Sequence, residues 1–378
     1  MTAAFSDPFP SRAAIRLLIF ADMLGASQAI AFVEGLSRAR REGRAAVCIV
    51  EEAALAPDAA ARVGPSARAV IQEAFDQTDP TAVVLSRFSL GGASEEIRAQ
   101  ARARALPLLA HIDDDLADLP VTAGVERYRA ARHPRRAHVL HQALTEADLV
   151  MAATPALADR LARRLGHGRI GWLDTGAAGA AGPHAGPAGD GAVVVGYMGS
   201  ASHDADLRMI APALNAILSG GPRVRLELFG SIARQPAADL LPGSTVRRDA
   251  VAGDYADFRR RLAGLGWDIG LAPLHDTPYN RCKTATKWAE YAEAGFAVIA
   301  SDMPVYQPIF AADAAMPARD GDWEPVLRRL IGSARVRQAL VRRADALLGA
   351  QYGWDRLEAQ VLGLIGGAAA RVAVAEPA

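Results

Sequence analysis

The sequence predicts an α/β protein built from two parallel-sheet domains, and three observations predict it. Short apolar runs alternate with amphipathic helical segments along most of the chain, which is the pattern of β-α-β units. A stretch rich in glycine, alanine and proline interrupts this alternation near the middle. The 378 residues are too many for one typical domain but suit two, and a 51% apolar composition lets each half bury a core.

The first half, residues 14–173, has the alternation that a parallel sheet requires. Helical patterns connect successive apolar runs, so each strand is expected to pair in parallel with a neighbour. The expected strands cover residues 16–20, 45–50, 82–86, 106–112 and 147–154, and the expected helices cover residues 28–42, 66–77, 95–103, 135–146 and 155–165.

Residues 174–192, DTGAAGAAGPHAGPAGDGA, follow this half. Their glycine, alanine and proline density without apolar periodicity predicts a linker. Residues 193–350 then repeat the alternation, and a last helix is expected within 351–366. The expected strands of this second half cover 193–198, 223–230, 245–251, 268–274 and 297–301, and its helices cover 206–218, 284–294, 324–331 and 334–348.

Residues 267–302, WDIGLAPLHDTPYNRCKTATKWAEYAEAGFAVIASD, form the most informative stretch. A buried strand is followed by a polar loop at 275–282 and then by a helix. The carboxyl ends of strands are where open α/β sheets bind ligands. The helix start adds free N–H groups and a positive dipole end, which favour a phosphate.

Lys283, Lys287 and Glu290 are spaced four and three apart, so they share one face of this helix. Two cations near a helix start suit a diphosphate, and a carboxylate one turn further suits ribose hydroxyls. The alternative is a solvated stripe of charges held by local pairing. The position directly after a buried strand and a polar loop favours the binding site.

The segment NRCKTATKWAEYAEAGFAVIASD resembles the nucleotide-sugar site of GT-B glycosyltransferases, in particular the group 1, family 4-like proteins. The resemblance implies two Rossmann-like parallel-sheet domains facing a central cleft, with the C-terminal helix crossing back to the N-terminal domain. The family motif is a Glu, seven residues and a second Glu that holds the donor ribose. Glu290 matches the second Glu, and Cys282 stands at the first. The loss of the first Glu bears on how the transferred sugar is held, and Lys283, beside Cys282, is the candidate to take over part of that role.

Further donor-site residues follow from the resemblance. Gly199 and Ser200 match the first loop of the C-terminal domain, whose backbone approaches the donor diphosphate. His203, nearby, could also reach into the site, although a lone histidine in a loop is more often exposed. Gly25 follows the first strand, where the family places donor phosphates, although a plain turn into a helix fits equally well. Asn280, in the polar loop, is counted with the donor-site residues.

An acidic run follows the strand at 106–112. It could hold a metal, act as a base toward an acceptor hydroxyl, or cap the next turn. Because GT-B enzymes generally do without a metal-binding acidic motif, no metal is expected. Asp113 or Asp114 is predicted near the acceptor, and Lys287 is predicted to assist catalysis at the leaving group.

The expected function is transfer of a sugar from a nucleotide-sugar donor to a sugar or glycan acceptor, in glycan or glycoconjugate synthesis. Retention of anomeric configuration is implied by the resemblance alone. No cofactor beyond the nucleotide-diphosphate sugar is expected. The alternatives are a nucleotide-sugar epimerase of GT-B fold, and a non-catalytic GT-B module that has lost the first Glu.

Composition excludes other classes of function. Lysine plus arginine and aspartate plus glutamate both total 42, and no basic tract stands out, so no nucleic-acid partner is expected. The sequence start lacks the pattern of a signal peptide, and the two cysteines form no disulfide framework. A cytoplasmic protein is therefore predicted, with peripheral membrane contact left open.

Overall fold

A computed structural model describes residues 13–55, 65–177, 191–220, 224–249, 253–319 and 321–375. Residues 178–190, most of the expected linker, lie outside the described residues. The chain forms two compact units, each described by itself below. The first comprises Met1–Ala117, Arg129–Gly176 and Trp354–Ala378, and the second comprises Asp118–Tyr128 and Ala177–Gly353. The sequence placed residues 118–128 in the first half, whereas the structure packs them with the second.

The first unit is a six-stranded parallel sheet of order β2-β1-β3-β4-β5-β6. The strand order reverses between β1 and β3, which makes the carboxyl ends of these strands a switch point. The strands are β1 (Ile15–Ala21), β2 (Ala45–Glu51), β3 (Ala82–Ser86), β4 (Leu108–Ile112), β5 (Leu149–Ala152) and β6 (Ile170–Trp172).

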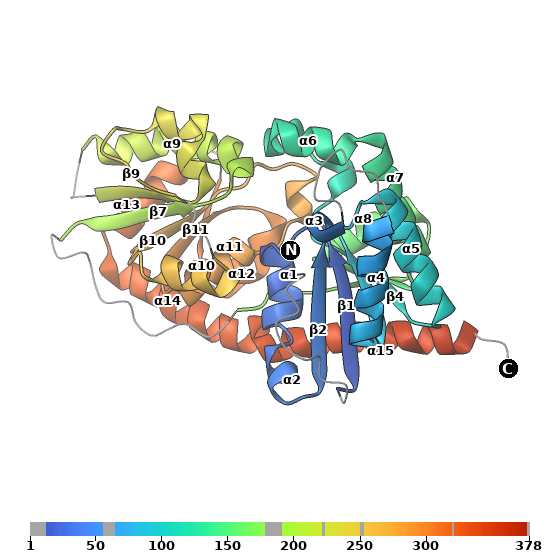
Figure 1. The fold of residues 1–378 in the computed structure, drawn as a ribbon. Coiled ribbons are helices and arrows are strands. Elements are labelled where there is room, and N and C mark those ends of the chain that lie inside the picture. The colour runs from blue at the N-terminus through green and yellow to red at the C-terminus, as the bar shows by residue number, and fades with distance from the viewer. Residues whose placement is uncertain are drawn as a thin grey trace. The chain divides into compact units, whose positions relative to one another are not determined.

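Helices surround this sheet, as the chain alternation predicts (Figure 1). They are α1 (Ala26–Gln28), α2 (Ser37–Arg41), α3 (Glu52–Leu55), α4 (Pro65–Thr78), α5 (Gly91–Ala103), α6 (Val125–Arg132), α7 (Pro134–Glu146), α8 (Pro155–Leu165) and α15 (Trp354–Ala375). Of these, α6 was not predicted, and its first residues belong to the second unit.

The helix expected at 28–42 is instead broken into α1, a π-helical turn (Ala29–Glu34) and α2. The break has a local cause. The N–H of Gly35 donates to the carbonyl of Ile30, five residues back, at 2.9 Å. A Cβ at Gly35 would lie 2.7 Å from that same oxygen, so only glycine allows this close turn.

The last helix, α15, packs within the first unit, against β4, β5 and α2. Its Glu358 is 3% exposed and is held from three sides. It accepts hydrogen bonds from the Ala39 N–H at 2.9 Å, from Arg38 at 3.1 Å and from Arg44 at 2.8 Å. A buried carboxylate satisfied in this way fixes the C-terminal helix on this unit, as the sequence resemblance implied.

The second unit is another six-stranded parallel sheet, of order β12-β11-β10-β7-β8-β9, and its order reverses between β10 and β7. The strands are β7 (Val193–Met198), β8 (Val224–Phe229), β9 (Val246–Arg248), β10 (Ile269–Ala272), β11 (Ala297–Ser301) and β12 (Met316–Ala318). The helices are α9 (Asp204–Leu218), α10 (Tyr255–Ala263), α11 (Thr286–Glu293), α12 (Gln307–Ala311), α13 (Trp323–Ile331) and α14 (Ala334–Leu347).

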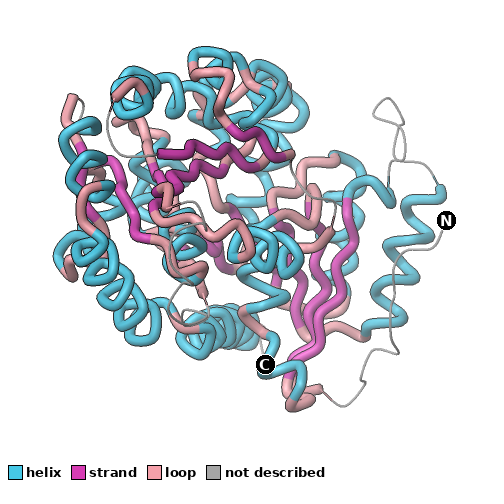
Figure 2. The backbone as a smooth tube through the Cα atoms, turned by 90° about the vertical axis from the view of Figure 1, so that its left-hand side faces the viewer, coloured by secondary structure: helices cyan, strands magenta, loops and turns pink. Residues whose placement is uncertain are grey.

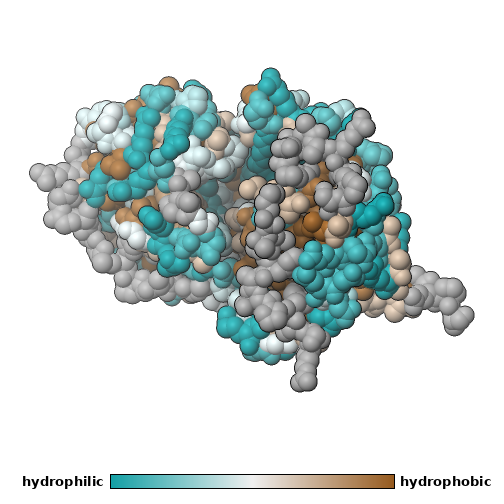
Figure 3. All heavy atoms as spheres, viewed as in Figure 1, coloured by the Kyte–Doolittle hydropathy of each residue, from teal (hydrophilic) through white to brown (hydrophobic). Residues whose placement is uncertain are grey.

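Two apolar cores cover the two faces of this sheet. One core contains side chains of α9 and α13, and the other contains side chains of α11 and the end of α14. Figures 1 and 2 show this three-layer arrangement, with α9 on one side of the strands and α10 and α11 on the other. The described surface visible in Figure 3 is mostly hydrophilic, as expected for helices that turn their apolar faces inward. Among the described residues, no helix has the length and apolarity needed to cross a membrane.

Two glycines in the strands of the second unit let aromatic rings reach the sheet. A Cβ at Gly196 of β7 would lie 1.9 Å from Cδ2 of Trp267, and one at Gly270 of β10 would lie 2.7 Å from the ring of Tyr291. Both rings are fully buried. The Tyr291 hydroxyl also accepts the N–H of Met198 at 2.8 Å, which fixes the end of β7 where the functional loop begins.

This packing predicts that Gly196→Ala destabilises the second unit. The new methyl group has no space beside Trp267, so the strand or the ring must shift, at a cost of about 1–3 kcal/mol. Urea unfolding followed by tryptophan fluorescence measures the loss. Gly220→Ala is the matched control, because a Cβ there meets nothing within 4 Å. Equal stability of the two variants would contradict the packing argument.

Candidate functional site

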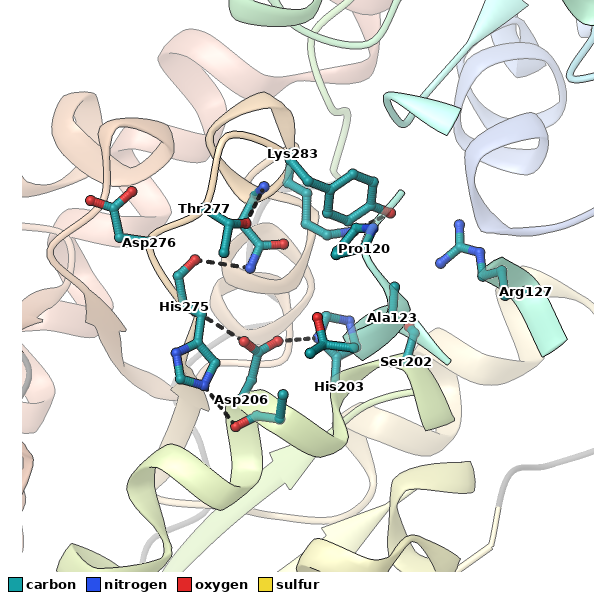
Figure 4. Close-up of a pocket in the computed structure, with 14 residues that line it drawn as sticks. Pro120, Ala123, Arg127, Ser202, His203, Asp206, His275, Asp276, Thr277 and Lys283 are labelled. Carbon is teal, nitrogen blue, oxygen red and sulfur yellow. Dashed lines mark hydrogen bonds and ion pairs between the residues drawn. The ribbon is translucent and has the colours of Figure 1, made fainter. Parts of the chain in front are cut away.

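A cavity of about 250 Å³ opens in the second unit at the carboxyl ends of β7 and β10 (Figure 4). The strand order reverses between these two strands, and α/β sheets bind ligands at such points. Three segments form its walls. They are the loop and short helix after β7, the polar loop after β10, and the segment 118–128, and they contribute Ser202, His203, Asp206, His275, Asn280, Lys283 and Arg127 among others.

The sequence contains just two lysines, Lys283 and Lys287, and of these only Lys283 is among the residues that line the cavity. Lys283 lines the cavity, with Nζ 3.4 Å from the Tyr279 hydroxyl and 4.7 Å from the centre of its ring. Lys287 sits one turn further along, with Nζ 4.5 Å from the centre of the Tyr197 ring. Both positions match a cation–π contact.

Lys287 is the unusual member of the pair. Its Nζ is buried and has no hydrogen-bond partner among the described residues. Burial lowers the pKa of Lys287 to about 8, although the carboxylates of Asp206 and Glu290 act in the opposite direction. The predicted stripe of three charges on one helix is therefore only partly correct, because Lys283 has an extended backbone and precedes α11, which begins at Thr286 and carries Lys287 and Glu290. A buried ammonium without hydrogen bonds is costly, and such groups mark sites that bind a partner of opposite charge.

Glu290 lies on the same helix and is 8% exposed. It accepts a hydrogen bond from the Tyr255 hydroxyl at 2.9 Å. Burial raises the pKa of Glu290 to about 7, against the opposing effects of Tyr255 and Lys287. The Tyr255 ring continues into a stack with Phe258 and Phe229, with ring centres 6.0 and 5.8 Å apart. This stack holds the hydroxyl that orients Glu290.

The glycine loop after β7 is tightly packed. Gly199 donates its N–H to Phe229 at 3.0 Å and accepts from Ile232 at 3.1 Å. Gly230 has a φ of +100°, and a Cβ there would lie 2.5 Å from the Gly199 carbonyl oxygen. Ser200 is exposed, and its hydroxyl bonds that of Ser202 at 2.7 Å. The backbone of this loop is thus held in place by neighbouring segments of the sheet.

The polar loop after β10 is shaped by Asn280. Its side-chain amide donates to the His275 carbonyl at 2.9 Å, and its N–H donates to the Thr277 hydroxyl at 3.1 Å. Asn280 lines the cavity, and Cys282 is buried at 3% exposure. The position of the family's first Glu therefore holds a small side chain packed into the protein.

The sequence left two possibilities open for His203, an exposed side chain or one that reaches into the site. The structure shows the second, because His203 lines the cavity and its Nδ1 lies 2.8 Å from an oxygen of Asp206. Asp206 is 5% exposed and also accepts the N–H of His275 at 3.0 Å. The His–Asp spacing of three at the start of α9 was the available signal, because it places both side chains on one face.

The remaining predicted residues, Gly25, Asp113 and Asp114, belong to the first unit. Gly25 precedes α1, with its N–H 3.2 Å from the side chain of Gln28 and a φ of −97°, so the turn does not need a glycine conformation. Asp114 is 8% exposed. Asp113 accepts hydrogen bonds from Ser27 and from Arg87, the latter at 3.1 Å.

Arg87 joins two carboxylates at the switch point of this sheet. Its Nε lies 3.1 Å from Asp22, which directly follows β1, while its Nη1 contacts Asp113 after β4. Burial pushes the pKa of Asp113 up, but Arg87 and the Ser27 hydroxyl outweigh it and hold the pKa below its usual range. Burial raises the pKa of Asp22 to about 6. Of the two, Asp22 has the chemistry of a proton acceptor near neutral pH.

Comparison with known proteins gives the fold a name. No family model and no curated protein matches the sequence. Solved structures match most of the chain, and three of them are described here. HepE from Anabaena in complex with UDP-glucose has a TM-score of 0.63 at 12% identity, with 93% of this chain and 99% of HepE covered.

The second is the α,α-trehalose-phosphate synthase (UDP-forming) from Burkholderia xenovorans in complex with glucose-6-phosphate, with a TM-score of 0.59 at 12% identity and coverages of 93% and 100%. The third is a glycosyltransferase from Rickettsia africae, with a TM-score of 0.60 at 9% identity and coverages of 94% and 98%. The chain has the GT-B fold. The two parallel sheets and the C-terminal helix that returns to the first unit confirm the fold predicted from sequence.

In this GT-B chain, the burial of Lys287 predicts a conflict between stability and binding. Lys287→Met removes a buried charge and keeps the length of the side chain, so we expect the ligand-free protein to gain about 1–3 kcal/mol at pH 7. The sign follows from the lowered pKa of Lys287, because the cost is present while the amine is protonated. Thermal melting measures the gain, and a lower melting temperature than wild type would contradict it.

Proposed function

We propose that this protein transfers a sugar from a nucleoside diphosphate sugar to an acceptor hydroxyl. The observation that carries the proposal is the buried ammonium of Lys287, which has no hydrogen-bond partner among the described residues. A ligand anion would supply the missing partner. Three features of the surroundings support a diphosphate in particular.

The first feature is the arrangement of donors around Lys287. Lys283 adds a second cation four residues earlier, beside the cavity. The N-terminus of α11, which begins at Thr286, adds the positive end of the helix dipole, which favours an anion. Gly199 would leave room for the diphosphate beside the loop after β7, while its own N–H donates to the Phe229 carbonyl. These donors would stabilise the negative charge that develops on the leaving nucleotide, which is the main source of catalysis in this reading.

The second feature is Glu290. The Tyr255 hydroxyl holds one of its oxygens, Oε1, at 2.9 Å. Its other oxygen could then accept hydrogen bonds from the two hydroxyls of a ribose, which lies next to the diphosphate in every nucleotide. Lys283, just before α11, and Lys287 and Glu290, on α11, would thus contact the two halves of a nucleoside diphosphate.

The third feature is the nucleotide named for solved proteins of similar fold. HepE was solved with UDP and with UDP-glucose, and the Burkholderia synthase is UDP-forming. At identities of 12–13% the likeness to this chain is one of fold. Their use of UDP makes uridine the first base to test.

In the transfer, the bond between the sugar carbon and the phosphate oxygen breaks, and the acceptor oxygen forms the new bond to that carbon. The acceptor hydroxyl loses its proton to a base. We propose the acceptor side in the first unit, with Asp113 or Asp114 positioning the acceptor and Asp22 as the proton acceptor. Retention of configuration and a role in glycan synthesis are proposed on the family resemblance, and a reducing cytoplasmic setting on the two free buried cysteines.

A thermal-shift screen with UDP, GDP, dTDP, ADP and CMP tests the donor site. One diphosphate is expected to raise the melting temperature, and at a hundredfold excess over Kd the gain is about 2.7 kcal/mol. The gain should vanish in Glu290→Ala and in Lys287→Ala. It should also vanish in Lys287→Arg, which keeps the charge, because the buried position beside Tyr197 fits a compact ammonium better than a planar guanidinium.

The alternatives give different outcomes. Nucleotide binding followed by release of free nucleotide only when an acceptor is present supports transfer. Conversion of the donor to a different sugar without acceptor would indicate an epimerase. Failure of every nucleotide to shift wild type would contradict the proposal and indicate a non-catalytic module.

The pKa values predict a bell-shaped pH dependence of diphosphate affinity. Glu290, with a pKa raised to about 7, gains its charge as the pH passes 7, and Lys287, with a pKa lowered to about 8, loses its charge above 8. Calorimetry should therefore find the tightest binding between these values. The terminal phosphate of the nucleotide itself titrates near pH 6. Glu290→Gln separates the two effects, since it should remove only the limb near pH 7, and an unchanged profile in this variant would contradict the assignment.

A further inference from the structure

His203 stands in the wall of the cavity and is held by one edge of its ring. Nδ1 lies 2.8 Å from one oxygen of Asp206, and the other oxygen of Asp206 accepts the N–H of His275 at 3.0 Å. Figure 4 shows Asp206 between the two histidines. Because the carboxylate is buried and bonded at both oxygens, it fixes the orientation of the imidazole.

This arrangement also fixes the tautomer. An ionised carboxylate only accepts hydrogen bonds, so the proton of the neutral imidazole lies on Nδ1 and Nε2 presents a lone pair. Burial lowers the pKa of His203 to about 4, and Lys287 contributes to the shift. The ring is therefore neutral at pH 7. No hydrogen bond joins Nε2 to another described residue, and Nε2 is accessible to solvent.

The side chain of His203 lies beside Gly199. A Cβ at Gly199 would lie 3.4 Å from Cβ of His203, which is at the tight end of an ordinary contact. His203 therefore lies directly beside the loop assigned above to the donor diphosphate. The group attached to that diphosphate is the transferred sugar, whose hydroxyls donate hydrogen bonds.

We propose that Nε2 of His203 accepts a hydrogen bond from a hydroxyl of the transferred sugar and thereby selects which sugar is bound. The inference rests on the proposed function. A phosphate oxygen is a poorer match for this position, because an unprotonated phosphate oxygen and the lone pair of Nε2 both accept.

The test compares two ligands on the same variants. Calorimetry gives Kd for a nucleoside diphosphate and for its sugar conjugate, with UDP and UDP-glucose as the first pair. His203→Phe keeps a planar ring but removes the acceptor. It should weaken UDP-glucose, or whichever conjugate wild type binds, by about tenfold and leave the diphosphate within about twofold.

Asp206→Asn is the second variant, and it acts through the tautomer. The Asn oxygen can keep the hydrogen bond from the His275 N–H, while the Asn amide group would donate to Nδ1 of His203. The imidazole proton then moves to Nε2, which becomes a donor. Because Asp206 also favours the charge on Lys287, this variant should weaken both ligands, and it should weaken the sugar conjugate more than the diphosphate although the ring stays in place.

Monodeoxy donor sugars identify the hydroxyl. One of them should bind more weakly than the parent sugar to wild type and equally to His203→Phe, because the same contact cannot be lost twice. His141→Gln, a change at an exposed histidine of α7, is the control for handling and folding.

Three results would overturn the inference. Equal weakening of the diphosphate and its sugar conjugate would place the phosphates at His203. Unchanged affinity for both ligands in both variants would leave His203 without a ligand contact. If the wild-type protein binds no nucleotide, both this inference and the proposed function are overturned. The other two results overturn the inference alone.

Discussion

The buried ammonium of Lys287 is the constraint on which the site depends. Taking a charge out of water costs several kcal/mol unless it is paired and hydrogen-bonded. Here the compensation is partial. The face of Tyr197 lies 4.5 Å from Nζ, and Asp206 and Glu290 favour the charge from further away, but no described residue donates or accepts a hydrogen bond at Nζ. The buried ammonium lowers the stability of the ligand-free protein, and binding of an anionic ligand is the simplest explanation for its presence.

The fold explains how the charge is held there. Rings fill the spaces left by glycines in the central strands of the second unit, and the Tyr291 hydroxyl fixes the end of β7. This end and the end of β10 are where the strand order reverses, so two loops diverge and leave a cavity between them. Of the 42 lysine and arginine residues in the sequence, only Lys283 and Lys287 are lysines. A compact ammonium that can be buried distinguishes lysine from arginine.

Much of this could be predicted from the sequence, for clear reasons. Apolar runs and helical periodicity report local structure, so five strands of each sheet were predictable, whereas the three-residue edge strands β6 and β12 were not. The spacing of Lys287 and Glu290 placed them on one helix, but Lys283 precedes that helix. What depended on contacts distant in sequence was not predictable. Residues 118–128 pack on the second unit, and Asp113 pairs with Arg87, 26 residues earlier.

His203 illustrates the same limit. Its pairing with Asp206 could be read from spacing, but its burial depends on how the loop after β7 packs against its surroundings. The break of the helix near Gly35 depends on a single close approach to a carbonyl. Neither effect leaves a periodic trace in the sequence. Both concern the exact placement of side chains rather than the order of elements.

The most direct test of the account follows the two lysines themselves. Protein labelled with ¹³C-lysine should give just two Cε signals, which belong to Lys283 and Lys287 and can be assigned with Lys283→Arg. We expect one signal to titrate near pH 8 in the free protein and to titrate at distinctly higher pH when the nucleoside diphosphate is bound, because the anion stabilises the ammonium. Two signals that both titrate as ordinary lysines, and that no nucleoside diphosphate moves, would contradict the central claim.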